Sequence, residues 1–137
     1  MILAMRHLYL LSFLVLGSCQ IIVYEEPTYY DDRDNVVGYY EVDEYSETTE
    51  QYFNYGIDVV KSCCNDNEII IYNFYDVDLD VVASINGSRI KIPLQHIGDY
   101  EIEGTGRIEN NSFTFTYVVH NRYQYPRTDF VSATAWR

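Results

Sequence analysis

The chain has 137 residues, which is enough for one domain with a modest hydrophobic core. Asp and Glu outnumber Lys and Arg by 21 to 9, and a net charge of −12 argues against nucleic acid as a partner and against direct adsorption on anionic lipid. Tyrosine accounts for 15 residues, and this composition, with many β-branched residues, favours an all-β domain.

The N-terminal segment has the organisation of a secretory leader. Arg6 provides a basic start, residues 8–16 form an apolar run, and residues 16–19 (LGSC) end it with two small residues and a cysteine. The apolar run is too short for a mature transmembrane helix, which needs about 20 residues, and is typical of a signal peptide. We therefore expect residues 1–18 to be a signal peptide.

The end of this leader resembles the lipobox of bacterial lipoproteins. In that family the cysteine is acylated, the leader is removed before it, and the cysteine becomes the first residue. The resemblance implies that Cys19 carries lipid and anchors the protein to the outer membrane of the cell envelope, on the periplasmic or the surface face. A plain secretory leader with an incidental cysteine is the alternative.

Residues 19–37 show no hydrophobic period. They contain Pro27, the acidic pair Glu25-Glu26 and an acidic cluster at residues 31–34 (DDRD). This composition predicts an extended, charged tether between the lipidated cysteine and the folded domain. The domain itself is expected over residues 38–137.

Beyond this tether the chain divides into strand-like runs separated by turn residues. Most runs alternate apolar and polar residues, whereas the run at 68–74 is almost continuously apolar and predicts a strand covered on both faces. The expected strands are 38–45, 52–61, 68–74, about 81–85, 89–97, 100–109, 113–119 and 130–136.

Turn chemistry connects these runs as hairpins. Asn86-Gly87 is the strongest signal, because both central residues of a type I′ turn need a positive φ, and Asn110-Asn111 predicts a second tight turn. Eight sequential strands with short links predict an antiparallel up-and-down meander that closes into a lipocalin-like barrel. The interior of such a barrel is filled by side chains or holds one small ligand.

The alternation also predicts which side chains face inward. This inner face comprises Tyr40, Val42, Phe53, Tyr55, Ile57, Ile90, Ile92, Leu94, Ile102, Phe113, Phe115, Tyr117 and Trp136. Gly104 and Gly106 lie on the same face and remove side-chain volume from it, which predicts a small cavity. The expected lining of a ligand cavity is Tyr40, Tyr55, Ile92, Ile102, Gly104, Gly106, Phe115 and Tyr117. If Tyr55, Ile92, Ile102 and Phe115 fill the centre, the ligand hypothesis fails.

With Cys19 lipidated, the remaining cysteines are the adjacent pair Cys63 and Cys64. This count excludes a framework of several disulfides. Two alternatives remain, a vicinal disulfide with strained peptide geometry or two reduced thiols. A zinc site is not expected, because no C-x-x-C motif or nearby histidine pair accompanies them.

Three segments resemble motifs of a known family. Residues 37–40 (VGYY) resemble the lipocalin G-x-W motif with tyrosine in place of tryptophan. Residues 85–93 (INGSRIKIP) and 104–113 (GTGRIENNSF) resemble two recurring hairpins of that family. Through them, residues 36–137 are similar to the small lipocalin-like, or calycin-like, lipoproteins of the Bacteroidetes group. The resemblance implies a lipocalin-like barrel and says little about activity.

No pattern in the chain predicts a reaction or a cofactor. His96 and His120 lie near strand ends without metal-ligand spacing, and residues 76–80 (DVDLD) lack the glycine and the glutamate of a calcium loop. Glu101 and Glu103 share one strand face, where a charged outer face explains them better than catalysis does. We therefore expect a non-enzymatic protein without catalytic or metal-binding residues.

Two hypotheses about function remain. The barrel is either a binding module for a small apolar or amphipathic ligand, or a barrel with a filled core that binds a protein partner through its loops, as an inhibitor would. A cavity in the structure would separate the two.

Overall fold

The computed structural model describes residues 23–26 and 29–137, so the predicted signal peptide and Cys19 lie outside the described residues. A short 3-10 helix, η1 (Asp32–Asn35), precedes the strands. The strands are β1 (Gly38–Ser46), β2 (Gln51–Lys61), β3 (Glu68–Phe74), β4 (Leu79–Asn86), β5 (Arg89–Ile97), β6 (Tyr100–Glu109), β7 (Ser112–Asn121) and β8 (Thr128–Trp136).

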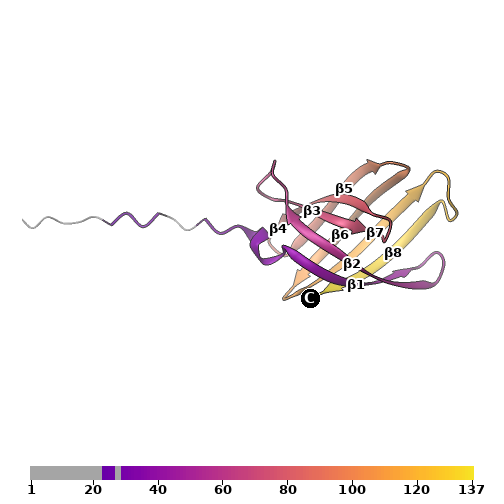
Figure 1. Cartoon of the computed structure of the whole chain (residues 1–137), viewed down its shortest axis with the longest axis horizontal. Helices are drawn as coiled ribbons and strands as arrows, with labels where there is room; N and C mark the ends of the chain where they lie inside the picture. Colours follow the sequence, from indigo (N-terminus) through magenta and orange to yellow (C-terminus); the bar gives the residue numbers. More distant parts are fainter. Residues whose placement is uncertain (1–22, 27–28) are drawn as a thin grey trace, which may run out of the picture.

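Each strand pairs antiparallel with its neighbours in sequence, and β8 pairs with β1, so the sheet is a closed barrel (Figure 1). This arrangement confirms the predicted all-β, up-and-down meander and is that of a lipocalin-like barrel. The barrel has two different ends. We call the end that carries η1 and the C-terminus the base, and the end at residues 47–50, 75–78, 98–99 and 122–127 the mouth.

The base is held by the segment just before β1, although these residues were predicted to be an extended tether. The buried Arg33 pairs with Asp31, with 2.9 Å between Nη2 and Oδ2. Its Nη1 atom donates to the carbonyl oxygens of Ser62, Asn65 and Glu68 at 3.2, 2.7 and 3.4 Å. The hydrogen bond from Arg33 holds the pKa of the Asp31 carboxyl well below its usual range. The arginine thus fastens η1 to the loop between β2 and β3.

The interior is packed by matching large residues with small ones. On β7, Phe115 and Tyr117 point inward opposite Gly106 and Gly104 of β6. A Cβ at Gly104 would lie 2.4 Å from the Cβ of Tyr117, so the glycine is needed for the close approach of these strands. The two aromatic rings therefore take the space that a cavity beside the glycines would have needed.

The same principle sets the orientation of β8. The prediction that Trp136 faces inward is wrong, because the buried residues of β8 are Asp129, Val131, Ala133 and Ala135. Ala135 and Ala133 lie opposite Phe113 and Phe115 of β7. Small residues on β8 make room for the large rings of β7.

A bulge in β5 moves Leu94 out of the interior. The register of β5 on β6 shifts between Ile92 and Gln95, which leaves Leu94 58% exposed, contrary to its predicted inward position. On the mouth side of Ser84, the backbones of β4 and β5 are no longer paired. The Gln95 side-chain amide joins the two strands there, accepting from Val82 N at 3.0 Å and donating to Val82 O at 2.8 Å. The Gln95 side chain thus makes the pair of hydrogen bonds to Val82 that a backbone residue of β5 would otherwise make.

A second irregularity lies in β3. Ile69 and Ile71 are buried, but Tyr72 is exposed, so the prediction of a strand covered on both faces is wrong. The register of β3 on β4 shifts between Ile71 and Phe74, where Asn73 adopts a φ of 58°, a conformation that asparagine tolerates. This shift returns Phe74 to the interior. The Asn73 side chain donates to Gly56 O at 2.8 Å and ties β3 to β2 where their backbone pairing has ended.

Three hairpins have two-residue turns, and their geometry differs from the prediction. Asn86 pairs with Arg89, so the central residues of that turn are Gly87 and Ser88, and only Gly87 has a positive φ, of 58°. The turns at Gly98 and Asn110 show the same pattern. None of these three turns is therefore of type I′, which requires a positive φ at both central residues.

Candidate functional site

The mouth of the barrel contains a cavity of about 240 Å³. It is lined by Glu44, Phe53, Tyr75, Asp76, Val77, Tyr100 and Gln124. Its volume lies just below the range of about 300–1,000 Å³ that is usual for drug-sized ligands, so it suits a smaller molecule. We call it the mouth cavity.

The mouth cavity exists because the strands around the β3–β4 turn separate. β2 pairs with β3 over four residues, from Asp58 to Lys61, and β4 pairs with β5 over three, from Ser84 to Asn86. Near the mouth, the first half of β2 is therefore not paired with β3, and the last half of β5 is not paired with β4. The short β3–β4 hairpin forms the rim between them.

That rim has an unusual backbone. Tyr75, Asp76 and Asp78 have φ values of 60°, 52° and 56°, in the left-handed region that residues other than glycine seldom adopt. Such conformations cost on the order of 1–3 kcal/mol each and persist when the surrounding contacts fix them. The Tyr75 hydroxyl supplies one such contact by donating to Asp129 Oδ2 at 2.6 Å. Strained backbone held in this way is common at binding sites.

The floor of the mouth cavity is a buried carboxylate. Glu44 is 2% exposed and lies inside the barrel on β1, in the same inward set as Tyr40 and Val42. The hydroxyls of Tyr55 and Tyr117 both donate to its Oε2 atom. Its Oε1 atom has no hydrogen-bond donor among the described side chains. Since no fully buried side-chain oxygen in the described part of the chain lacks a partner, Oε1 is not fully buried. Because Glu44 points into the barrel and lines the mouth cavity, we infer that Oε1 borders this cavity.

Burial raises the pKa of Glu44, and the hydrogen bonds from Tyr117 and Tyr55 partly oppose that rise. Burial and the nearby carboxylate also raise the pKa of Tyr55 well above its usual value, and burial does the same for Tyr117. Both phenols therefore remain donors at neutral pH. The carboxyl group has two fixed donors on one side and an open cavity on the other.

A second buried carboxylate supports the rim. Asp129 on β8 accepts from Ser46 Oγ at 2.6 Å and from Tyr75, so both of its oxygens are occupied. Ser46 in turn accepts from the backbone N and the hydroxyl of Thr49 at 3.0 and 2.8 Å. This network joins β8, the β1–β2 loop and the β3–β4 turn. Asp129 thus accepts hydrogen bonds at both oxygens, whereas Glu44 accepts them at Oε2 alone.

The walls of the mouth cavity are aromatic. Phe53 belongs to the inward set of β2 but is 40% exposed, because it lies at the rim. Tyr75 and Tyr100 pack edge to face, with ring centroids 6.5 Å apart. Among the described lining residues there are two acids, Glu44 and Asp76, and no base.

The residues predicted from the sequence to line a cavity lie together inside the barrel. The six with side chains, Tyr40, Tyr55, Ile92, Ile102, Phe115 and Tyr117, are at most 8% exposed. The centre of the barrel is therefore filled by these side chains, so the prediction of a central ligand cavity beside Gly104 and Gly106 is wrong, and with it the ligand hypothesis in its central form. The mouth cavity is a different space with a different lining. Tyr55 and Tyr117 still reach the site, because both bind Glu44.

Sequence reasoning missed the two carboxylates. The alternation that places Tyr40 and Val42 inward also places Glu44 inward, and this signal was present in the pattern. Asp129 could not be found in the same way, because both sets of alternating residues on β8 contain apolar side chains and the pattern does not show which set faces inward.

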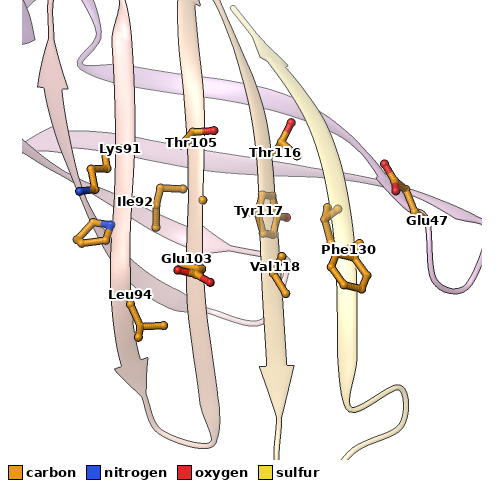
Figure 2. Close-up of a pocket in the computed structure, with 13 residues that line it drawn as sticks. Glu47, Lys91, Ile92, Leu94, Glu103, Thr105, Thr116, Tyr117, Val118 and Phe130 are labelled. Carbon is orange, nitrogen blue, oxygen red and sulfur yellow. The ribbon is translucent and has the colours of Figure 1, made fainter.

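A shallow groove of about 590 Å³ crosses the outer wall from β5 to β8 (Figure 2). Figure 2 shows Leu94, Glu103, Val118 and Phe130 in a row across four neighbouring strands. Leu94 is 58% and Phe130 53% exposed. This outer groove is more open to solvent than the mouth cavity.

The other candidate groups lie apart from the mouth cavity. Cys63 and Cys64 are exposed free thiols with 3.0 Å between their Sγ atoms. His96 lies 3.3 Å from Glu101, and His120 contacts Thr128. Across residues 23–26 and 29–137, no group of three or more His, Cys, Asp or Glu side chains could hold a metal ion. Within these same residues, no helix has the length and apolar character needed to cross a membrane.

No protein-family model matches the chain, and no curated protein matches it in sequence.

Proposed function

We propose that this protein is a non-enzymatic binding module that holds one small amphipathic ligand in the mouth cavity. The observation that carries the proposal is the buried Glu44, whose Oε2 is fixed by two tyrosines while Oε1 faces the cavity. A few placed polar groups within largely apolar walls are typical of sites for small molecules. The strained rim and the Asp129 network support a preformed site.

The proposal includes a lipid anchor at Cys19, as in the lipocalin-like lipoproteins of the Bacteroidetes group that the sequence resembles. The N-terminal segment leaves the barrel at the base, the end opposite the β1–β2 turn (Figure 1). An anchored barrel would then present its mouth away from the outer membrane, toward soluble ligands. This orientation suits a protein that captures small molecules in the cell envelope.

The test is a screen of small amphipathic fragments against the purified full chain, followed by NMR. We expect shift changes at Phe53, Val77 and Tyr100. Val77→Trp should abolish them by filling the cavity, whereas Leu94→Ser, a change in the outer groove, should leave them intact. Absence of any shift change at the mouth would contradict the proposal.

The outer groove favours a second candidate function, recognition of a protein partner. Leu94 and Phe130, exposed on the outer face of the sheet, form the kind of apolar patch that often marks an interface. In the same screen, shift changes confined to Leu94, Val118 and Phe130 would favour this candidate over the first.

A further inference from the structure

The mouth cavity combines three properties that together specify the charge of its ligand. Its floor is a carboxyl group, its walls are aromatic rings, and its described lining contains no basic residue. We propose that it binds an organic ammonium cation, with the positive charge against Glu44 and the alkyl groups against the aromatic walls. This inference rests on the proposed function and names the chemical class of its ligand.

The first argument concerns the partner that Glu44 lacks. A buried charge is costly unless it is paired and hydrogen-bonded. Tyr55 and Tyr117 satisfy only Oε2, and both are neutral donors. A cation in the cavity would lie next to Oε1 and supply the missing charge. Asp129 does not compete for it, because Ser46 and Tyr75 already occupy both of its oxygens.

The second argument concerns the walls. A cation within about 6 Å of the face of an aromatic ring is attracted by the ring quadrupole, and alkylated ammonium groups are commonly held by several rings at once. Phe53, Tyr75 and Tyr100 surround the mouth cavity, which is small enough to match such a group. Aromatic walls would offer nothing to a metal ion, which needs several oxygen or nitrogen ligands.

The third argument concerns the electric field at the entrance. Asp76 lies at the rim, and the chain carries a net charge of −12. A cleft lined by one sign of charge raises the local concentration of ligands of the opposite sign. Anionic ligands are disfavoured for the same reason, so the amphipathic ligand of the proposed function would be cationic or neutral.

The experiment compares two molecules of nearly the same shape. Choline is a quaternary ammonium ion, and 3,3-dimethylbutan-1-ol is its neutral isostere. Binding of each to the purified full chain is measured by NMR titration and calorimetry. We expect choline to bind about tenfold or more tightly than the alcohol, and Glu44→Gln to lose that advantage, as removal of one partner of a buried charge pair predicts. Glu109→Gln, an exposed change at the base, should leave binding unchanged.

A second variant covers the case in which Glu44→Gln does not fold. Phe53→Leu keeps an apolar side chain at the exposed rim but removes the ring. We expect it to weaken choline binding by about threefold or more, as the loss of a cation–π contact predicts, with little effect on the alcohol.

The outcomes separate the two proposals. Equal binding of choline and the alcohol at the mouth would overturn the ammonium inference and leave the binding function in place. If neither choline nor the alcohol binds but fragments of other chemistry bind at the mouth, the ammonium inference is overturned and the binding function remains. Failure of every fragment at the mouth would overturn the proposed function as well.

Discussion

At the scale of single residues, Glu44 places a titratable group where its charge is unfavourable. Its pKa is raised by burial, and the nearby Asp129 and Asp76 add to that rise. A carboxyl whose pKa is higher in the folded state stabilises the fold at pH values below its unfolded pKa. That contribution is lost as the pH rises through the folded pKa.

We therefore expect Glu44→Gln to be more stable than the wild type at pH 8, with the difference disappearing toward pH 4. Glutamine keeps an oxygen that can accept from Tyr55 and Tyr117 without a charge. Even a one-unit pKa difference corresponds to about 1.4 kcal/mol, or roughly 5 °C in Tm for a domain of this size. Thermal unfolding across this pH range is the measurement. Parallel curves for the two proteins would contradict the expectation, and Glu109→Gln serves as the control for net charge.

At the scale of elements, each of the three two-residue hairpin turns has one residue with a positive φ. A Cβ at Gly87 would meet nothing within 4 Å, so the cost of a substitution there comes from its φ of 58° alone. We expect Gly87→Val to destabilise the barrel by about 1–3 kcal/mol, because a β-branched residue rarely adopts this conformation. Gly87→Asn, which tolerates it better, should retain most of the stability. Chemical denaturation is the measurement, and a Gly87→Val midpoint equal to that of the wild type would refute the role of this turn.

Strand positions could be predicted from the sequence because alternation and turn residues are local signals. The expected strands 68–74, 89–97 and 100–109 have the same bounds as β3, β5 and β6, and the other strands agree to within a few residues. The inward set was harder to predict wherever a bulge intervened. One irregularity moves Leu94 out of the interior and another brings Phe74 into it, and both depend on how β5 and β3 pair with their neighbours.

The candidate site could be predicted only in part. Glu44 follows from the alternation along β1, but nothing local shows that Tyr55 and Tyr117 converge on it from β2 and β7. The mouth cavity depends on where strand pairing ends around the β3–β4 turn, which is a property of the closed barrel. Such features arise from contacts between residues far apart in the sequence, and short-range patterns do not encode them.

At the scale of the whole molecule, the N-terminal segment and the mouth cavity lie at opposite ends of the barrel. Arg33 and Arg137 fasten the N-terminal segment to the base, since Arg137 Nη2 donates to the carbonyl oxygens of Asn35 and Val37 at 2.9 and 3.0 Å. The mouth cavity lies at the other end. This separation lets a tether at the base leave the mouth unobstructed.

The proposed lipid anchor at Cys19 can be tested with a simple variant. Each buried CH₂ of an acyl chain contributes about 0.8 kcal/mol, and stable anchoring needs more than one chain, as lipoproteins have. We expect Cys19→Ala to move the protein from the membrane fraction to the soluble fraction, or to leave an uncleaved precursor, with the mass of the lipid absent. The matched control replaces both Cys63 and Cys64 with alanine. These exposed thiols lie on the β2–β3 loop, and their loss should not alter membrane association. Unchanged fractionation and mass in Cys19→Ala would rule out the anchor, and with it the orientation of the mouth away from the membrane.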